Sequence, residues 1–94
     1  MTSIIKSKDM VVDTITKANT TVSASGYTEV TIDATKSGYT PIGVVGINKT
    51  GGSSVYCVPS TFYIDNGTFH MYLRNTSTSS ATVTVVVSVL YQKA

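Results

Sequence analysis

The sequence predicts an all-β protein, an antiparallel β-sandwich of jelly-roll-like type, and three observations support this fold class. Thr (16), Val (13) and Ser (12) supply 41 of the 94 residues, and the β-branched Thr and Val favour strands over helices. Short segments of alternating polarity recur about every 8–12 residues between turns rich in Gly, Ser and Asn, as in β-sandwiches. No segment has useful helical periodicity. We expect residues 1–94 to form a single domain with one modest core.

A β-hairpin at Asn66-Gly67 is the best-defined element that the sequence predicts. This dipeptide favours a two-residue type I′ turn, in which both residues have positive φ. The turn fixes the register, and the predicted facing pairs are Asp65–Thr68, Ile64–Phe69, Tyr63–His70, Phe62–Met71 and Thr61–Tyr72. Because successive side chains point to opposite faces, the predicted core face holds Phe62, Ile64, Phe69, Met71 and Leu73. The predicted opposite face holds Tyr63, His70, Tyr72 and Arg74.

Other strands are predicted from alternation and from turn residues. Residues 10–17, with Ile4-Ile5 before them, have no clean apolar face, so we expect residues 1–17 to form an edge strand or a connector. Residues 21–25 and 28–35 are expected to be strands, with Gly38 supplying a positive φ in the turn that follows. Two further strand segments are expected, with a bend at Pro59-Ser60 between them. They are residues 55–58 and 61–64.

Two segments are unusually apolar for a small domain. Residues 40–47 are apolar on both faces, which indicates a strand that is either central in its sheet or covered by another subunit. Gly43 and Gly46 suggest bulges or close approach of another backbone there. The last strand has a predicted core face of Ala81, Val83, Val85, Val87, Val89 and Tyr91. Its outward face still carries Val86 and Leu90, and we therefore predict a homotrimer.

The composition disfavours several classes of partner. The net charge is only +2 and no basic cluster exists, so no nucleic-acid partner is expected. No apolar run approaches the roughly 20 residues of a membrane span, and the first residues lack a signal-peptide pattern. We therefore expect a soluble protein that does not bind membranes. Cys57 is the only cysteine, which excludes an intrachain disulfide, and we predict that it is a small core side chain.

Catalytic and metal-binding patterns are also missing from the sequence. His70 is the only histidine, and no sequence feature brings Cys57 or a serine beside it, as nucleophilic catalysis requires. The five acidic residues are scattered, which disfavours a metal site. Their spacing alone leaves a pair of catalytic carboxylates open, but solubilising charge explains them more simply. We expect no enzyme activity and no cofactor.

Tyr63, His70, Tyr72 and Arg74 are the candidate ligand-binding residues. Flat aromatic rings beside hydrogen-bond donors suit a sugar or a peptide. Cross-strand pairing that only stabilises the sheet, or burial against a neighbouring subunit, would explain the same residues. The loops 48–53 and 75–80 are further candidate positions, since loops on a rigid sheet often carry binding residues.

Three segments resemble the C-terminal domain of tail proteins from phages and prophages of Gram-positive bacteria. They are Ser37-Gly-Tyr-Thr-Pro-Ile-Gly-Val-Val-Gly46, Leu73-Arg-Asn75 and Ala81-Thr-Val-Thr-Val-Val-Val-Ser-Val-Leu-Tyr91. The resemblance covers roughly residues 20–91, and its motifs are structural. It implies the β-sandwich head of a trimeric tail fibre or baseplate receptor-binding protein, made in the bacterial cytoplasm and located in the extracellular virion tail.

Two functions follow from this resemblance and stay open. The first is a trimeric head that binds host cell-wall glycan without catalysis and assembles with other tail proteins. The second is a structural module that trimerises or caps a fibre and binds no ligand. The chain begins at Met1 without a shaft segment, so an excised domain and a stand-alone protein are both compatible with it.

Overall fold

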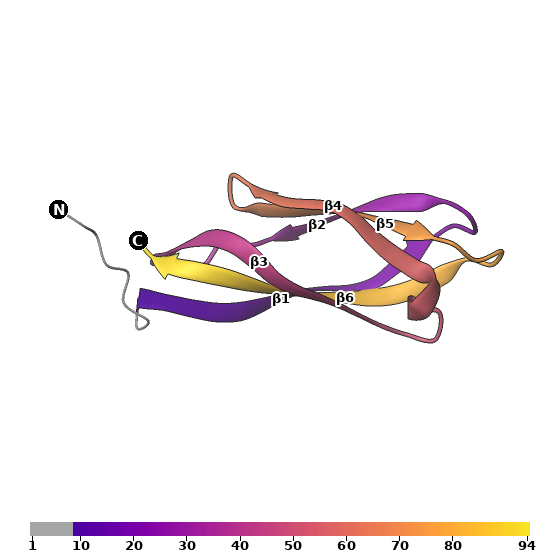
Figure 1. Cartoon of the computed structure of the whole chain (residues 1–94), viewed down its shortest axis with the longest axis horizontal. Helices are drawn as coiled ribbons and strands as arrows, with labels where there is room; N and C mark the ends of the chain where they lie inside the picture. Colours follow the sequence, from indigo (N-terminus) through magenta and orange to yellow (C-terminus); the bar gives the residue numbers. More distant parts are fainter. Residues whose placement is uncertain (1–8) are drawn as a thin grey trace.

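The computed structural model describes residues 9–94 and contains two antiparallel three-stranded β-sheets (Figure 1). The strands are β1 (Met10–Val22), β2 (Tyr27–Asp33), β3 (Tyr39–Thr50), β4 (Cys57–Asp65), β5 (Thr68–Asn75) and β6 (Ala81–Lys93). Sheet A has the order β1-β6-β3, and sheet B has the order β2-β5-β4. The two sheets lie face to face as the layers of a rod-like, sandwich-like molecule of 56 × 20 × 20 Å. The all-β prediction is confirmed.

The core fills the space between β6 at the centre of sheet A and β5 at the centre of sheet B. All six residues predicted for the inner face of the last strand are buried. From sheet B, Phe69, Met71 and Leu73 meet them with no exposed surface, as the hairpin register predicts. Cys57 is also fully buried, which confirms its prediction as a core side chain. Burial of alternate residues along both strands explains their period of two.

The hairpin between β4 and β5 has the predicted turn. Asn66 and Gly67 both have positive φ, at 51° and 80°, and four of the five predicted pairs form, from Asp65–Thr68 to Phe62–Met71. The fifth prediction is wrong, because Ser60 rather than Thr61 lies opposite Tyr72. Thr61 is the extra residue of a β-bulge and has a φ of 46°. A bulge adds one residue to one strand and so shifts the register beyond it.

We expect Gly67→Val to destabilise the domain by roughly 1–3 kcal/mol, because a β-branched residue is strained at positive φ. The structure adds a second cause, since a Cβ at Gly67 would lie 2.9 Å from Cγ2 of Thr35. Urea denaturation of the two proteins measures the difference. Gly38→Val is the matched comparison, because Gly38 also has positive φ but a Cβ there meets no atom within 4 Å. A Gly67→Val protein as stable as the wild type would contradict this prediction.

Of the two edge strands of sheet A, β3 differs from the expectations and β1 confirms the expected edge strand for residues 10–17. β3 is an edge strand of sheet A, so the prediction that residues 40–47 could form a central strand is wrong. Its predicted bulges are confirmed, because the register with β6 shifts between Pro41 and Gly43 and again between Val44 and Gly46. Residues 10–17 and 21–22 belong to one continuous strand, β1, at the other edge of sheet A. Ile4-Ile5 lies outside the described residues.

The segment before the hairpin also differs. Val55 lies in a 3-10 turn, Ser54–Tyr56, rather than in a strand. Pro59 and Ser60 do not interrupt β4, which continues through them and is bulged at Thr61 instead. Proline is tolerated at this place because β4 is an edge strand, where a missing N–H donor can face away from the sheet. Among residues 9–94, no helix is long and apolar enough to cross a membrane.

The loop between β5 and β6 is organised by Asn75, whose side chain is fully buried. Its Nδ2 donates to the carbonyl oxygens of Val22 (3.1 Å) and Ser79 (2.8 Å). Its Oδ1 accepts from the backbone N–H (2.9 Å) and the hydroxyl (2.8 Å) of Ser77. Asn75 therefore links the end of β1 in sheet A to the end of β5 in sheet B.

Candidate binding face

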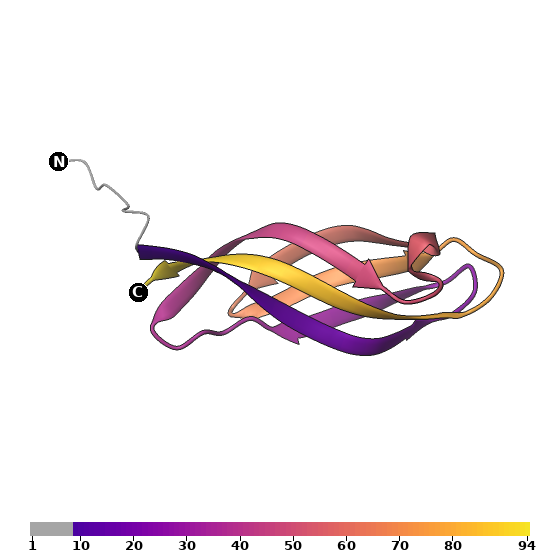
Figure 2. The same cartoon turned by 90° about the horizontal axis from the view of Figure 1, so that it is seen from below.

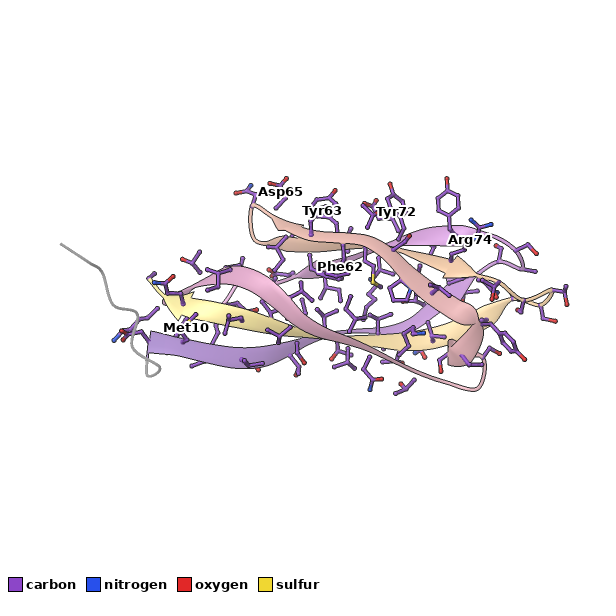
Figure 3. All side chains as sticks on the ribbon, viewed as in Figure 1. Met10, Phe62, Tyr63, Asp65, Tyr72 and Arg74 are labelled. Atoms are coloured by element: carbon purple, nitrogen blue, oxygen red, sulfur yellow. The ribbon has the colours of Figure 1, made fainter. Side chains whose placement is uncertain are left out.

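The outer face of sheet B gathers aromatic and hydrogen-bonding side chains from three neighbouring strands. The pairing of β5 with β2 and with β4 places the following residues on this surface, called here the aromatic face: Tyr27, Glu29, Ser60, Tyr63, His70, Tyr72 and Arg74. Tyr63, Tyr72 and Arg74 point away from sheet A, on the opposite side of the sheet from the core (Figure 3). The sequence predicted that Tyr63, His70, Tyr72 and Arg74 share one face, and the register brings all four to it.

Two cross-strand pairs order the rings on this face. Tyr63 stacks on His70, with ring centroids 4.8 Å apart and an angle of 12° between the planes. Tyr27 meets Tyr72 edge to face, at 5.7 Å and 73°. Both are favourable aromatic geometries. The three tyrosines nevertheless remain 71%, 47% and 40% exposed at Tyr27, Tyr63 and Tyr72, respectively. The rings are thus held by their neighbours and still offer surface to a ligand.

A shallow hollow of about 330 Å³ lies at the Arg74 end of the aromatic face. Its lining consists of Tyr27, Ser60, Tyr72 and Arg74. Three hydroxyl groups in this lining can donate or accept hydrogen bonds, and the guanidinium supplies a rigid fork of N–H donors. No acidic residue of the described chain lies within ion-pair distance of Arg74. The guanidinium therefore faces the hollow without a neutralising carboxylate from residues 9–94.

His70 and Glu29 form the other polar pair of this face. Nδ1 of His70 lies 3.5 Å from Oε2 of Glu29, which makes an ion pair when the imidazole is protonated. Nδ1 is buried and has no hydrogen-bond partner within the described chain. Its ring is held by Tyr63 on one side. Nδ1 is therefore not accessible to a ligand. His70 contributes to this face mainly through the stacking of its imidazole plane on Tyr63.

Sequence reasoning missed Tyr27, Glu29 and Ser60 as members of the aromatic face. A signal for Tyr27 was present, because alternation along the predicted strand 28–35 places Tyr27 on the same side as Glu29. Ser60 could not be found, because only the bulge at Thr61 turns it outward, opposite Tyr72. The two loops proposed as further binding positions, residues 48–53 and 75–80, are shorter in the structure than the sequence predicted. Residues 48–50 belong to β3, and Asn75 is buried at the end of β5.

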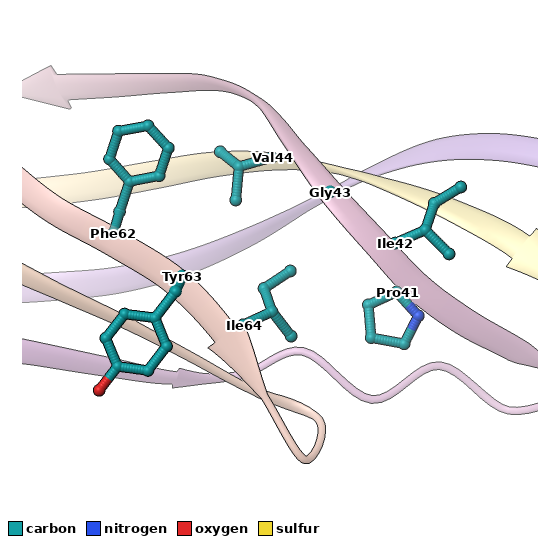
Figure 4. A pocket seen from close by; sticks show the side chains of 7 residues that line it. All are labelled: Pro41, Ile42, Gly43, Val44, Phe62, Tyr63 and Ile64. Carbon is teal, nitrogen blue, oxygen red and sulfur yellow. The ribbon is translucent and has the colours of Figure 1, made fainter.

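A second hollow, of about 270 Å³, lies between the edge strands β3 and β4 (Figure 4). It is lined by Pro41, Ile42, Gly43, Val44, Phe62, Tyr63 and Ile64. Phe62 was predicted to lie on the core face, and its ring does lie on the inner face of sheet B. The prediction that it is a core residue is wrong, because the ring is 50% exposed at the open edge between the two sheets. Its lining side chains are apolar apart from the Tyr63 hydroxyl, so most polar groups there belong to the backbone of the two edge strands.

Nucleophilic and metal chemistry find no support in the arrangement of the described residues. Cys57 lies on the inner face of sheet B and His70 on its outer face, so the sheet separates thiol from imidazole. Among residues 9–94, no three His, Cys, Asp or Glu side chains are grouped as metal ligands. The chemistry that the aromatic face offers is stacking, hydrogen bonding and attraction of a negative group.

We compared the chain with protein-family models, curated proteins and solved structures. No family model matches the chain, no curated protein matches it, and no solved structure matches it.

Proposed function

We propose that this domain is the head of a phage tail fibre or baseplate receptor-binding protein, and that it recognises host cell-surface carbohydrate without catalysis. The aromatic face is the observation that carries the proposal. It combines exposed, ordered tyrosine rings with hydroxyl groups and a guanidinium that forms no ion pair with a carboxylate of residues 9–94, which is the chemistry of a sugar site. The phage context comes from the resemblance of residues 37–46, 73–75 and 81–91 to tail proteins. With it we propose a jelly-roll-like, homotrimeric organisation in the virion tail.

In this proposal a sugar ring lies with its apolar C–H face on Tyr72 or Tyr27. Its hydroxyl groups hydrogen-bond to the tyrosine hydroxyls and to Ser60, which surround the hollow. Arg74 receives an acidic substituent such as a carboxylate or phosphate, because its planar fork binds either group through two parallel hydrogen bonds. Binding by one head can be weak, since three heads on one fibre raise the effective concentration of the remaining sites.

We expect Tyr72→Ala and Arg74→Ala each to weaken binding of the oligomer to purified Gram-positive cell walls by at least about tenfold, equivalent to roughly 1.4 kcal/mol in the free energy of oligomer binding. Sedimentation with the walls measures bound against free protein. Tyr56→Ala is the matched control, because Tyr56 is also an exposed tyrosine (51%, against 40% for Tyr72) but lies in the 3-10 turn outside the aromatic face. Circular dichroism and light scattering show that each variant remains folded and keeps its oligomeric state.

If both variants bind as well as the wild type, the aromatic face is not the site. If the wild-type oligomer binds no wall preparation from a panel of hosts, the second candidate function replaces the first. That candidate is a structural module that trimerises or caps a fibre. The apolar outward residues of sheet A, among them Val12 at 59% exposure, are the observation that favours it.

A further inference from the structure

The turn between β4 and β5 is attached to the segment that follows β2. Figure 2 shows sheet A nearest the viewer, and the turn belongs to the layer behind it, sheet B. The carbonyl oxygen of Gly67 accepts a hydrogen bond of 2.9 Å from the backbone N–H of Ala34. Ala34 is fully buried, and its own carbonyl oxygen accepts from the hydroxyl of Tyr91 at 2.8 Å. The tip of the hairpin is therefore joined to β6 through Ala34.

Asn66 and Gly67 carry the two groups that react in the spontaneous loss of ammonia from asparagine, a side chain that is chemically labile in proteins. In this reaction the backbone nitrogen of the next residue attacks the side-chain amide. Asn66 is exposed to water. The N–H of Gly67 lies outside the β4–β5 ladder and donates to no other backbone group of residues 9–94. Gly67 also has no side chain that could shield its nitrogen. Both groups are therefore available to react.

The structure separates Asn66 from the other three asparagines of the chain. Asn75 is buried, with both atoms of its amide in hydrogen bonds. Asn48 is held in the ladder of β3. Asn19 is the most similar, because it is exposed and has a φ of 54°, against 51° at Asn66. It is followed, however, by Thr20, whose β-branched side chain crowds the nitrogen that would have to attack.

We propose that Asn66 is a site of spontaneous modification, at which the side-chain amide becomes a carboxylate by way of a cyclic imide. A base takes the proton of the Gly67 N–H, and the nitrogen forms a bond to Cγ of Asn66. The bond from Cγ to Nδ2 breaks, and Nδ2 leaves with a proton as ammonia. Water then adds to the imide and breaks one of the two carbonyl bonds of the Gly67 nitrogen. Water is the only co-reactant, and nothing is oxidised or reduced.

The two ways of opening the imide have different consequences for the hairpin. When the bond to Cγ breaks, the product is aspartate and the main chain is unchanged. Asp-Gly is also a favoured type I′ pair, so we expect this product to keep the turn and its register. When the bond to the main-chain carbonyl breaks, the product is isoaspartate. The main chain then runs through Cβ and Cγ, and the extra methylene no longer fits a two-residue turn between paired strands.

The contact with Ala34 makes isoaspartate at position 66 costly. A longer turn displaces Gly67, whose carbonyl oxygen is the acceptor for the N–H of Ala34. Because Ala34 is fully buried, its N–H would lose this partner without gaining water. Both products also place a new negative charge beside Asp65, but only isoaspartate changes the backbone. A direct Asn66→Asp variant therefore isolates the effect of charge from the effect of the longer turn.

The test incubates the folded wild type in warm, mildly alkaline buffer and follows each asparagine by peptide mapping with mass spectrometry. Replacement of NH₂ by OH marks conversion, and labelling by an isoaspartate methyltransferase marks the second product. We expect Asn66 to react at least about tenfold faster than Asn19, a difference of roughly 1.4 kcal/mol in the barrier. Asn66→Gly is the unreactive control, because Gly-Gly also suits a type I′ turn.

Urea denaturation then compares the products. We expect Asn66→Asp to unfold as the wild type does, and the isoaspartate fraction, separated by chromatography, to have an unfolding constant at least about tenfold larger. If Asn66 in the folded protein reacts no faster than Asn19, the proposal is overturned, even where the urea-unfolded chain reacts at Asn66, because the native turn then protects this residue. An isoaspartate fraction as stable as Asn66→Asp overturns the part assigned to the Gly67–Ala34 contact.

Discussion

Replacing Asn75 by alanine is expected to destabilise the domain by about 3–5 kcal/mol, because four hydrogen bonds worth roughly 1 kcal/mol each are lost together. The side chain makes four hydrogen bonds, two as donor to Val22 and Ser79 and two as acceptor from Ser77. Alanine removes all four and leaves the buried carbonyl of Val22 without this donor. Because Val22 and Asn75 belong to different sheets, the change also weakens the join between the two layers.

Urea denaturation followed by circular dichroism measures the loss. Asn75→Asp is an informative second variant, because it keeps the oxygen that accepts from Ser77 but loses both donated bonds and places a carboxylate in a fully buried position. Ser77→Ala is the milder comparison, since it removes one of the four bonds, and we expect it to cost about 1 kcal/mol. A free energy of unfolding within 1 kcal/mol of wild type for both Asn75 variants, roughly the value of one ordinary hydrogen bond, would refute this role.

Phe69→Ala is expected to cost about 3–5 kcal/mol, as large-to-small changes of fully buried aromatic residues do. Phe69 has no exposed surface and belongs to the buried core between the two sheets. Phe62→Ala removes the same group from the same hairpin face, but we expect it to cost only about 1 kcal/mol. The Phe62 ring is 50% exposed beside the β3–β4 hollow, so truncation removes half as much buried area and water fills the space.

The difference between the two phenylalanine variants is the quantity to measure, by denaturant unfolding under identical conditions. Equal costs would mean that the edge near Phe62 is covered in solution, for example by another copy of the chain. Performing both measurements over a range of protein concentrations separates these cases, because only a covered edge gives a concentration-dependent stability.

The hairpin and the last strand could be predicted because their register follows from local chemistry. Asn66-Gly67 permits positive φ at two successive positions, and this fixes every pair as far as Phe62–Met71. In β6 the alternation of valines with hydroxyl residues already separates the buried face from the outward one. A slip by one residue would expose a whole row of valines, so the core itself enforces the register.

Strand order and local irregularities could not be predicted. Residues 40–47 are apolar on both faces, a pattern shared by central strands and by edge strands that another subunit covers, and the sequence does not distinguish them. The bulge at Thr61 depends on how β4 must twist to follow the sheet, which is a property of the assembled fold. Val55 likewise lies in a 3-10 turn although its neighbours favour strands.

The sequence predicted most residues of the candidate site that belong to the β4–β5 hairpin, and it missed those that belong to β2. Tyr63, His70, Tyr72 and Arg74 belong to one hairpin, whose faces follow from the turn. Tyr27 and Glu29 come from β2, whose residues pair with β5 residues 35 to 47 positions further along the chain, and no local pattern predicts such a pairing. Contacts between distant segments are the part of a fold that single-sequence patterns leave undetermined.

The central position of β6 in sheet A determines when the strands of each sheet can pair during synthesis. Sheet B is built from strands that end at Asn75, so all its pairings are available once β5 has left the ribosome. Sheet A is different, because β1 and β3 never touch as neighbours and both wait for β6, the last strand to be synthesised. Until it arrives, each keeps two unpaired edges, the kind of surface that pairs with foreign strands. Closing these long-range pairs is slow, so the nascent chain passes through a stage in which all three strands of sheet B have been synthesised while sheet A still lacks its central, thirteen-residue strand.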